Sequence, residues 1–127
     1  MLRNSLFSGY GRGMNQFPIT TTFDLPGTDI VQYRGAAYGI VVRSMGFAKG
    51  IGAAFKGITG GEVSQYTRLL EDSRRQAVDR LIQNAIALGG NAVVGMRFDS
   101  SEIGGQFTEI VAYGTAVIVQ ARAVPAP

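Results

Sequence analysis

The most regular hydrophobic pattern in the chain predicts an amphipathic helix from about Ser64 to Leu88, with apolar positions every three or four residues and polar positions opposite. Ser64 is suited to cap the amino end, and Gly89 and Gly90 are suited to end the helix in a left-handed turn. We expect Asn91 to hydrogen-bond the exposed helix carbonyls or to adopt a left-handed conformation itself. The apolar stripe consists of Tyr66, Leu69, Leu70, Ala77, Leu81, Ile82, Ala85 and Leu88.

Segments with strand patterns precede and follow this helix in the sequence. Runs of β-branched and aromatic residues predict strands over residues 17–23, 29–43, 92–98 and 107–120. The second of these strands contains Gly35 and Gly39, which indicate a bulge or a bend, and a polar loop is expected over 100–105. Period two predicts that Ala92, Val94, Met96 and Phe98 pack beneath the helix, whereas Arg97 and Asp99 point away from it.

These elements predict an α+β fold, a small β-β-α-β-β domain with one long helix packed on an antiparallel sheet. The length of 127 residues suits a single domain. We place that domain at residues 17–120, between a flexible N-terminal tail, 1–16, and a C-terminal tail, 121–127.

The final strand is apolar on both faces, because Val111, Tyr113, Val117 and Val119 alternate with Ile110, Ala112, Ala116 and Ile118. A helix of about 37 Å, at 1.5 Å per residue, covers only one side of a small sheet. The other side therefore needs a second cover, and we expect another copy of the chain to supply it. The candidate interface residues are Phe47, Ile51, Phe55, Ile110 and Ile118. In the alternative, segment 45–58 forms a short amphipathic helix that folds over its own sheet and leaves a monomer.

The composition excludes several kinds of chemistry. The chain has no cysteine and no histidine, so it has no disulfide, no thiolate or imidazole catalyst, and no nitrogen or sulfur ligand for zinc beyond weak methionine. Asp99, Glu102 and Glu109 gather near one predicted loop, where carboxylates could hold magnesium or calcium or perform acid/base work. A carboxylate-dependent metal-binding protein or hydrolase is therefore the alternative function, and we expect no cofactor.

The charge distribution does not favour nucleic acid as a partner. The net charge is +3, with Arg3 and Arg12 in an acid-free stretch and the rest of the chain nearly neutral, so no concentrated basic face is expected. An adaptor that contacts RNA through this tail ranks third. Segment 45–58 also fits a helix on a membrane surface, but two lysines are weak anchors and we prefer an assembly contact. The sequence has no secretory hydrophobic region and no membrane-spanning run, so we expect a cytoplasmic protein.

Residues 87–99, Ala-Leu-Gly-Gly-Asn-Ala-Val-Val-Gly-Met-Arg-Phe-Asp, together with the helix before them, resemble the YbjQ-like family of small bacterial and archaeal proteins. Segments 30–35 and 113–119 are similar to the same family, and the resemblance covers about residues 17–120. It implies a dodecin-like subunit that assembles into a ring, typically a pentamer, and it implies no catalytic role. The family is often described as heavy-metal-binding, which the lack of thiolate and imidazole here does not support. We therefore predict a non-enzymatic, ring-forming protein that binds a small ligand or a protein partner at clefts between subunits.

Overall fold

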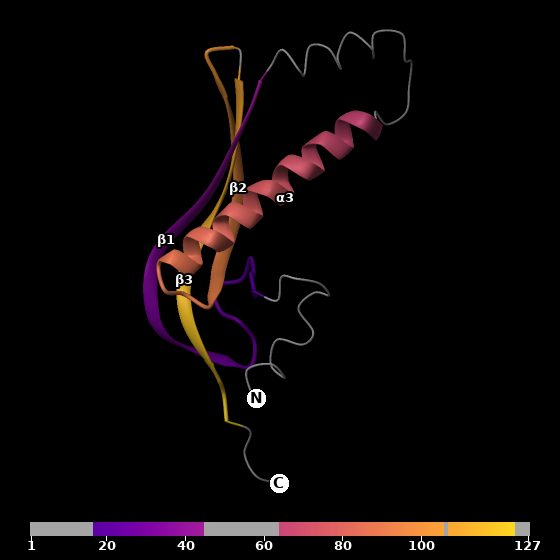
Figure 1. Ribbon diagram of the computed structural model, residues 1–127. Helices are drawn as coiled ribbons and strands as arrows, with labels where there is room; N and C mark the ends of the chain where they lie inside the picture. Colours follow the sequence, from indigo (N-terminus) through magenta and orange to yellow (C-terminus); the bar gives the residue numbers. More distant parts are fainter. Residues whose placement is uncertain (1–16, 45–63, 106, 124–127) are drawn as a thin grey trace.

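One helix packs on a three-stranded antiparallel sheet in the computed structural model, which describes residues 17–44, 64–105 and 107–123 (Figure 1). The elements are β1 (Thr28–Ser44), α3 (Ser64–Ala87), β2 (Ala92–Ile103) and β3 (Phe107–Ala121). The predicted α+β class and the packing of one long helix on an antiparallel sheet are confirmed.

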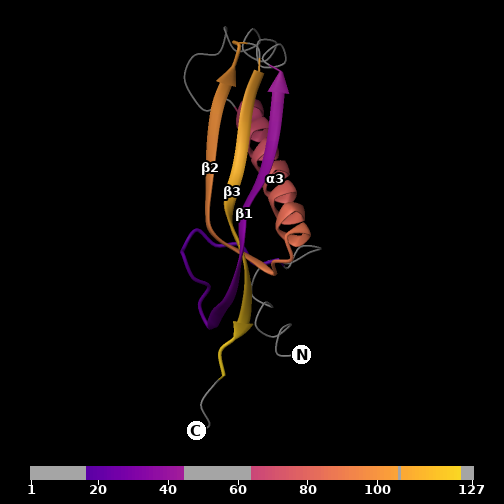
Figure 2. The ribbon, with the colours of Figure 1, turned by 90° about the vertical axis from the view of Figure 1, so that its left-hand side faces the viewer.

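The strands lie in the order β1-β3-β2, so that β3 occupies the centre (Figure 2). In β1 the pairing with β3 shifts twice, between Ile30 and Gln32 and between Tyr33 and Gly35. Gly35 has a φ of 112°, so the predicted irregularity at a glycine of this strand is confirmed. In the lower part of Figure 1 the bent strand curves beneath the helix.

Residues 17–23, predicted as a strand, contain only an isolated parallel bridge between Ile19 and Val93. The backbone of this segment does hydrogen-bond to β2, but it does not continue as a regular ladder, because the chain bends over residues 21–24, where threonine hydroxyls form local hydrogen bonds. Thr22 N–H donates to Thr20 Oγ1 at 3.1 Å, and the Thr22 hydroxyl donates to the Asp24 carbonyl at 2.6 Å. The described chain therefore has three strands where the sequence predicts four.

The carboxyl end of α3 closes as the glycine pair predicts. Gly89 N–H donates to the Ile86 carbonyl and Gly90 N–H to the Ala85 carbonyl, both at 2.9 Å, and Gly89 has a φ of 87°. Asn91 behaves differently from the prediction, since its side chain bonds to β3 and not to the helix. Its Nδ2 donates to the Val119 carbonyl at 3.0 Å, and Val119 N–H donates to its Oδ1 at 2.8 Å. The amide side chain thus continues the sheet at the point where the chain leaves α3.

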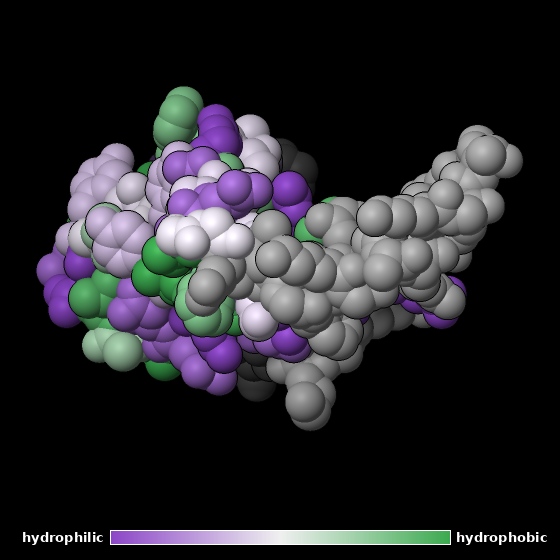
Figure 3. All heavy atoms as spheres, turned by 90° about the horizontal axis from the view of Figure 1, so that it is seen from above, coloured by the Kyte–Doolittle hydropathy of each residue, from purple (hydrophilic) through white to green (hydrophobic). Residues whose placement is uncertain are grey.

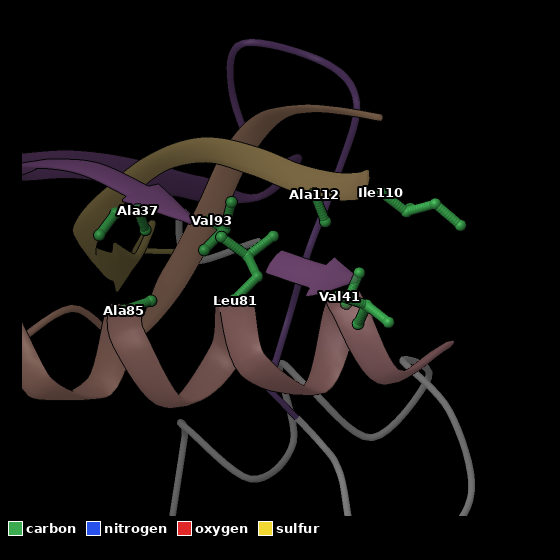
Figure 4. Close-up of a cluster of buried hydrophobic side chains, with 9 residues drawn as sticks. Ala37, Val41, Leu81, Ala85, Val93, Ile110 and Ala112 are labelled. Carbon is green, nitrogen blue, oxygen red and sulfur yellow. The ribbon is translucent and has the colours of Figure 1, made fainter. Parts of the chain in front are cut away.

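The main core lies between α3 and the sheet, as Figure 4 shows. Its buried members are Ala37, Val41, Ala77, Leu81, Ala85, Val93, Ile110, Ala112 and Ala116. Many of them are alanines, which lets the helix lie close to the strands. The contact is closest at Gly39, where an added Cβ would lie 1.9 Å from the Ala77 carbonyl oxygen.

The residues of β2 that face α3 differ from the predicted ones, because the strand contains a bulge. The pairing with β3 shifts between Val94 and Arg97, where β2 contains one extra residue. Val93, Met96 and Phe98 therefore pack toward α3, whereas Ala92 and Val94 lie in a second buried cluster. Arg97 and Asp99 point away from α3, as predicted, because they follow the bulge.

The second cluster lies on the sheet face opposite α3, where Leu25 covers Ala92, Val94, Val117 and Val119. The sequence predicts that a second copy of the chain, or alternatively segment 45–58, covers this face. The structure shows that the turn preceding β1 covers its lower part, because Leu25 is 2% exposed. Arg122 fastens this end by donating to the Asp29 carboxylate at 3.0 Å.

The predicted polar loop over 100–105 is shorter than expected. β2 continues to Ile103, which lies opposite Phe107 of β3, and Gly104 and Gly105 form the turn with φ values of 60° and 69°. The predicted helix over 45–58 and the tail over 1–16 lie outside the described residues. In the part that the structure describes, no helix is long and apolar enough to cross a membrane.

Candidate functional site

The upper part of the sheet face opposite α3 is the candidate functional site, and we call it the open face. β1, β3 and β2 each contribute alternate residues to it, because strand side chains point to opposite faces in turn. The residues of the open face are Tyr38, Ile40, Val42, Ile103, Phe107, Val111 and Tyr113, with Arg97, Asp99, Ser101 and Glu109 among them.

The apolar side chains of the open face are strongly exposed for a sheet surface. Tyr38, Ile40 and Val42 of β1 are 54%, 46% and 51% exposed. The register places Ile40 opposite Val111 and Tyr38 opposite Tyr113, so the exposed residues are direct cross-strand neighbours. Figure 3, a view from above, shows hydrophobic residues at the surface among polar ones.

The charged groups of the open face have both signs. Arg97 Nη1 donates to the Thr21 and Met96 carbonyls at 2.9 and 2.8 Å, and its guanidinium lies 5.8 Å from the Phe23 ring centroid. Among the described residues, the hydrogen bond that Asp99 accepts is a local one, from Ser100 N–H at 2.9 Å. The guanidinium is therefore held in place by main-chain oxygens, and the carboxylate remains available to an incoming group.

The three candidate carboxylates do not converge on one point. Asp99 lies opposite Val111 and Glu109 opposite Ser101, so both carboxylates belong to the open face. Glu102 lies on the other face of β2, because it is an odd number of residues from Asp99 along a regular stretch of strand. No group of three or more metal-ligating side chains occurs among residues 17–44, 64–105 and 107–123.

A heavy-metal ion does not fit this donor set. Soft and borderline metals prefer thiolate and imidazole, and the full sequence contains neither cysteine nor histidine. Two carboxylates on one face leave most of the oxygen shell of even a hard cation to water. The arrangement can therefore present an apolar surface with fixed charges, but it does not form a coordination site.

The structure distributes the predicted interface residues among several places. Ile110 is 4% exposed beneath α3, so it is a core residue of the single chain, and Ile118 is half-buried. Phe47, Ile51 and Phe55 lie outside the described residues. Sequence reasoning missed Tyr38, Ile40 and Val42, although a signal was present. The small residues Ala37 and Gly39 alternate with Tyr38 and Ile40 along β1, which indicates that the small side faces the close helix.

The chain matches a protein-family model and several proteins at nearly half sequence identity. A family model described as "Putative heavy-metal-binding" matches residues 17–120. A UPF0145 protein of Sulfurisphaera tokodaii is 48% identical over 101 residues, which cover 80% of this chain and 89% of that protein. A UPF0145 protein of Bradyrhizobium sp. (strain ORS 278) is 47% identical over 102 residues, which cover 80% of this chain and 92% of that protein.

A solved structure shares the fold. It is a protein of unknown function of the DUF74 family from Pediococcus pentosaceus, with a TM-score of 0.55 and 16% sequence identity. The match covers 84% of this chain and 100% of that one. At this identity the likeness concerns the architecture alone.

Proposed function

Because this chain belongs to the YbjQ family, whose relatives compared above are named only as UPF0145 proteins, we propose that it is a non-enzymatic, ring-forming homo-oligomer. Its subunits meet through the open face. The observation that carries this proposal is the row of half-exposed apolar side chains on the sheet face that α3 does not cover. Contiguous apolar surface of this kind is rare on soluble monomers.

The energetic case rests on burial. Covering the exposed half of an Ile, Val or Tyr side chain contributes about 1 kcal/mol, so the strand neighbours Tyr38, Ile40, Val42 and Tyr113 together contribute several kcal/mol. The aromatic members are also residue types that dominate interface energetics. An interface centred on these side chains gains most where the single chain exposes most apolar surface.

A second copy is the partner that this face fits best. Among its apolar side chains the open face carries one basic group, Arg97, and two carboxylates, Asp99 and Glu109. A second copy of the chain therefore brings an acidic group for Arg97 and a basic group for the carboxylates. The subunit number of five is what the resemblance to the ring-forming family implies. The proposed location remains the cytoplasm.

The proposal includes a small ligand or protein partner at the clefts between subunits. The row of Tyr38, Tyr113 and Arg97 supports this part, because two aromatic rings and a fixed guanidinium can stack on a planar group and hydrogen-bond an anionic one. Native mass spectrometry of the gently purified protein checks it. Extra mass on the assembly is expected, and empty rings contradict the ligand part alone.

Light scattering coupled to size-exclusion chromatography tests the assembly with a matched pair of variants. The wild-type chain is expected at a multiple of its 13.5 kDa mass, and Ile40→Lys is expected to shift the protein toward a single chain. Ile86→Lys introduces the same charge at another isoleucine, on α3, which is 57% exposed and lies outside the open face, and it should leave the assembly intact.

Circular dichroism of both lysine variants separates loss of assembly from loss of folding. A folded Ile40→Lys protein with unchanged particle mass, or a wild-type particle of 13.5 kDa at micromolar concentration, contradicts the proposed assembly.

A further inference from the structure

The outer edge of β1 is covered by side chains of the chain's own helix. β1 is an edge strand, and edge strands present unpaired N–H and C=O groups to which another strand can add. Backbone groups of alternate residues point outward in an antiparallel ladder. On β1 the outward groups include the N–H of Tyr38 and the carbonyl of Ile40, the two residues that flank Gly39.

Two residues one turn apart on α3 occupy these outward groups. Tyr38 N–H donates to Asn84 Oδ1 at 2.8 Å, and Arg80 Nη1 donates to the Ile40 carbonyl. The spacing of four residues places Arg80 and Asn84 on one side of the helix. Their polar ends therefore take the positions that a neighbouring strand's backbone would occupy.

This arrangement depends on how close α3 lies to β1. The space at Gly39 lets the Ala77 carbonyl approach the strand, so side chains from the same helix face can extend over the edge. A third contact holds the lower part, where Arg34 Nε donates to the Leu88 carbonyl at 2.7 Å. Figure 2 shows the helix on the β1 side of the sheet.

The opposite edge of the sheet is paired at a similar level by the segment that precedes β1. Val93 N–H donates to the Pro18 carbonyl and Thr20 N–H to the Val93 carbonyl, each at 3.0 Å. Gly95 N–H continues this pairing by donating to the Thr22 carbonyl at 2.7 Å. In the middle of the molecule, outward backbone groups of both edges are therefore hydrogen-bonded by the chain itself, whereas the open face remains exposed.

We propose that Arg80 and Asn84 shield the β1 edge against addition of a strand from another copy of this chain. The shield is a property of the single chain and operates whether or not the proposed ring forms. Where the ring forms, the shield directs its contacts to the open face and away from edge-to-edge pairing.

Amide hydrogen exchange at Tyr38, read by NMR or by fragment-resolved mass spectrometry, tests the shield in the full chain. Asn84→Ala should raise the exchange rate of the Tyr38 amide about fivefold or more, because its hydrogen-bond partner is lost. The amide of Val41, which points toward β3, serves as the internal reference and should not change. Alanine favours the helix more than asparagine does, so the change does not act by unfolding α3.

Gln83→Ala is the matched control, since Gln83 is the exposed neighbour of Asn84 on the same helix. It should leave both amides unchanged. A Tyr38 amide that stays equally slow in Asn84→Ala overturns the proposal, because another group, such as a neighbouring copy's strand, then pairs with it. The same exchange increase in Gln83→Ala also overturns it.

The double variant Arg80→Ala/Asn84→Ala tests the consequence of removing the shield. Dynamic light scattering should detect particles larger than the wild-type species, growing with concentration, and infrared spectroscopy should detect additional intermolecular strand pairing. A double variant that stays at the wild-type size overturns the shielding role. Failure of the ring proposal is read separately, from the particle mass of the unmodified chain.

Discussion

Replacement of Gly39 by alanine should destabilise the fold more than most single methyl additions. The new Cβ would lie 1.9 Å from the Ala77 carbonyl oxygen and 2.4 Å from the Leu81 backbone nitrogen. Optimal contact between heavy atoms is about 3.5 Å or more, so α3 would have to withdraw by roughly 1.5 Å. Overpacking typically costs about 1–3 kcal/mol. We expect the upper end of that range, about 3 kcal/mol, because both obstructing atoms belong to backbone and no side chain can rotate away.

Urea denaturation followed by circular dichroism, at one fixed protein concentration, measures the free energy of unfolding of this variant. Gly104→Ala is the control, because Gly104 has a φ of 60° and nothing within 4 Å of an added Cβ. It reports backbone strain alone, which we expect to cost about 1 kcal/mol. A loss below that control value for Gly39→Ala would refute the close seating of α3 on β1, and the basis of the edge shield with it.

Two further predictions concern metal binding and the start of β2. After dialysis against zinc, cadmium or copper(I), elemental analysis should find well under one ion per chain, and a stoichiometric ion on the wild-type chain contradicts the absence of a soft-metal site. The variant Ile40→His/Val111→His puts two imidazoles opposite each other and next to Asp99, and it should hold more zinc than the wild-type chain does. Asn91→Ala removes two hydrogen bonds to the Val119 backbone and should lower the free energy of unfolding by about 2 kcal/mol, as measured by urea denaturation. The control Gln120→Ala changes an exposed residue and should lower it little. Equal effects of the two variants would count against the role of Asn91 in joining the start of β2 to β3.

The elements whose pattern is local were predictable from the sequence. The helix was expected over 64–88 and ends at Ala87, and the final strand was expected over 107–120 and ends at Ala121. Both predictions use only the spacing of apolar residues along one segment, and the folded chain keeps the helix or strand that this spacing indicates. The prediction that both faces of the final strand are apolar was correct for the same reason, since the extra residues that shift the pairing belong to β1 and β2 and not to β3.

The errors arose where one segment depends on another. The extra residue in β2 becomes a bulge only when β2 is aligned with β3, so period two assigned Ala92 and Val94 to the wrong face. The segment over 17–23 has strand propensity, yet local hydroxyl hydrogen bonds compete with the ladder. The candidate carboxylates are close in sequence, but alternation along β2 separates Glu102 from Asp99.

The sequence alone determined the class of fold, the position of the long helix and the chemistry that is excluded, because periodicity and residue type are properties of the chain itself. The tertiary structure alone decided which apolar residues remain exposed. Leu25 covers one end of the second sheet face, α3 covers the whole main core, and the open face around Ile40 is what these two covers leave. Exposure depends on the distance between segments that are far apart in sequence, and no local pattern records that distance.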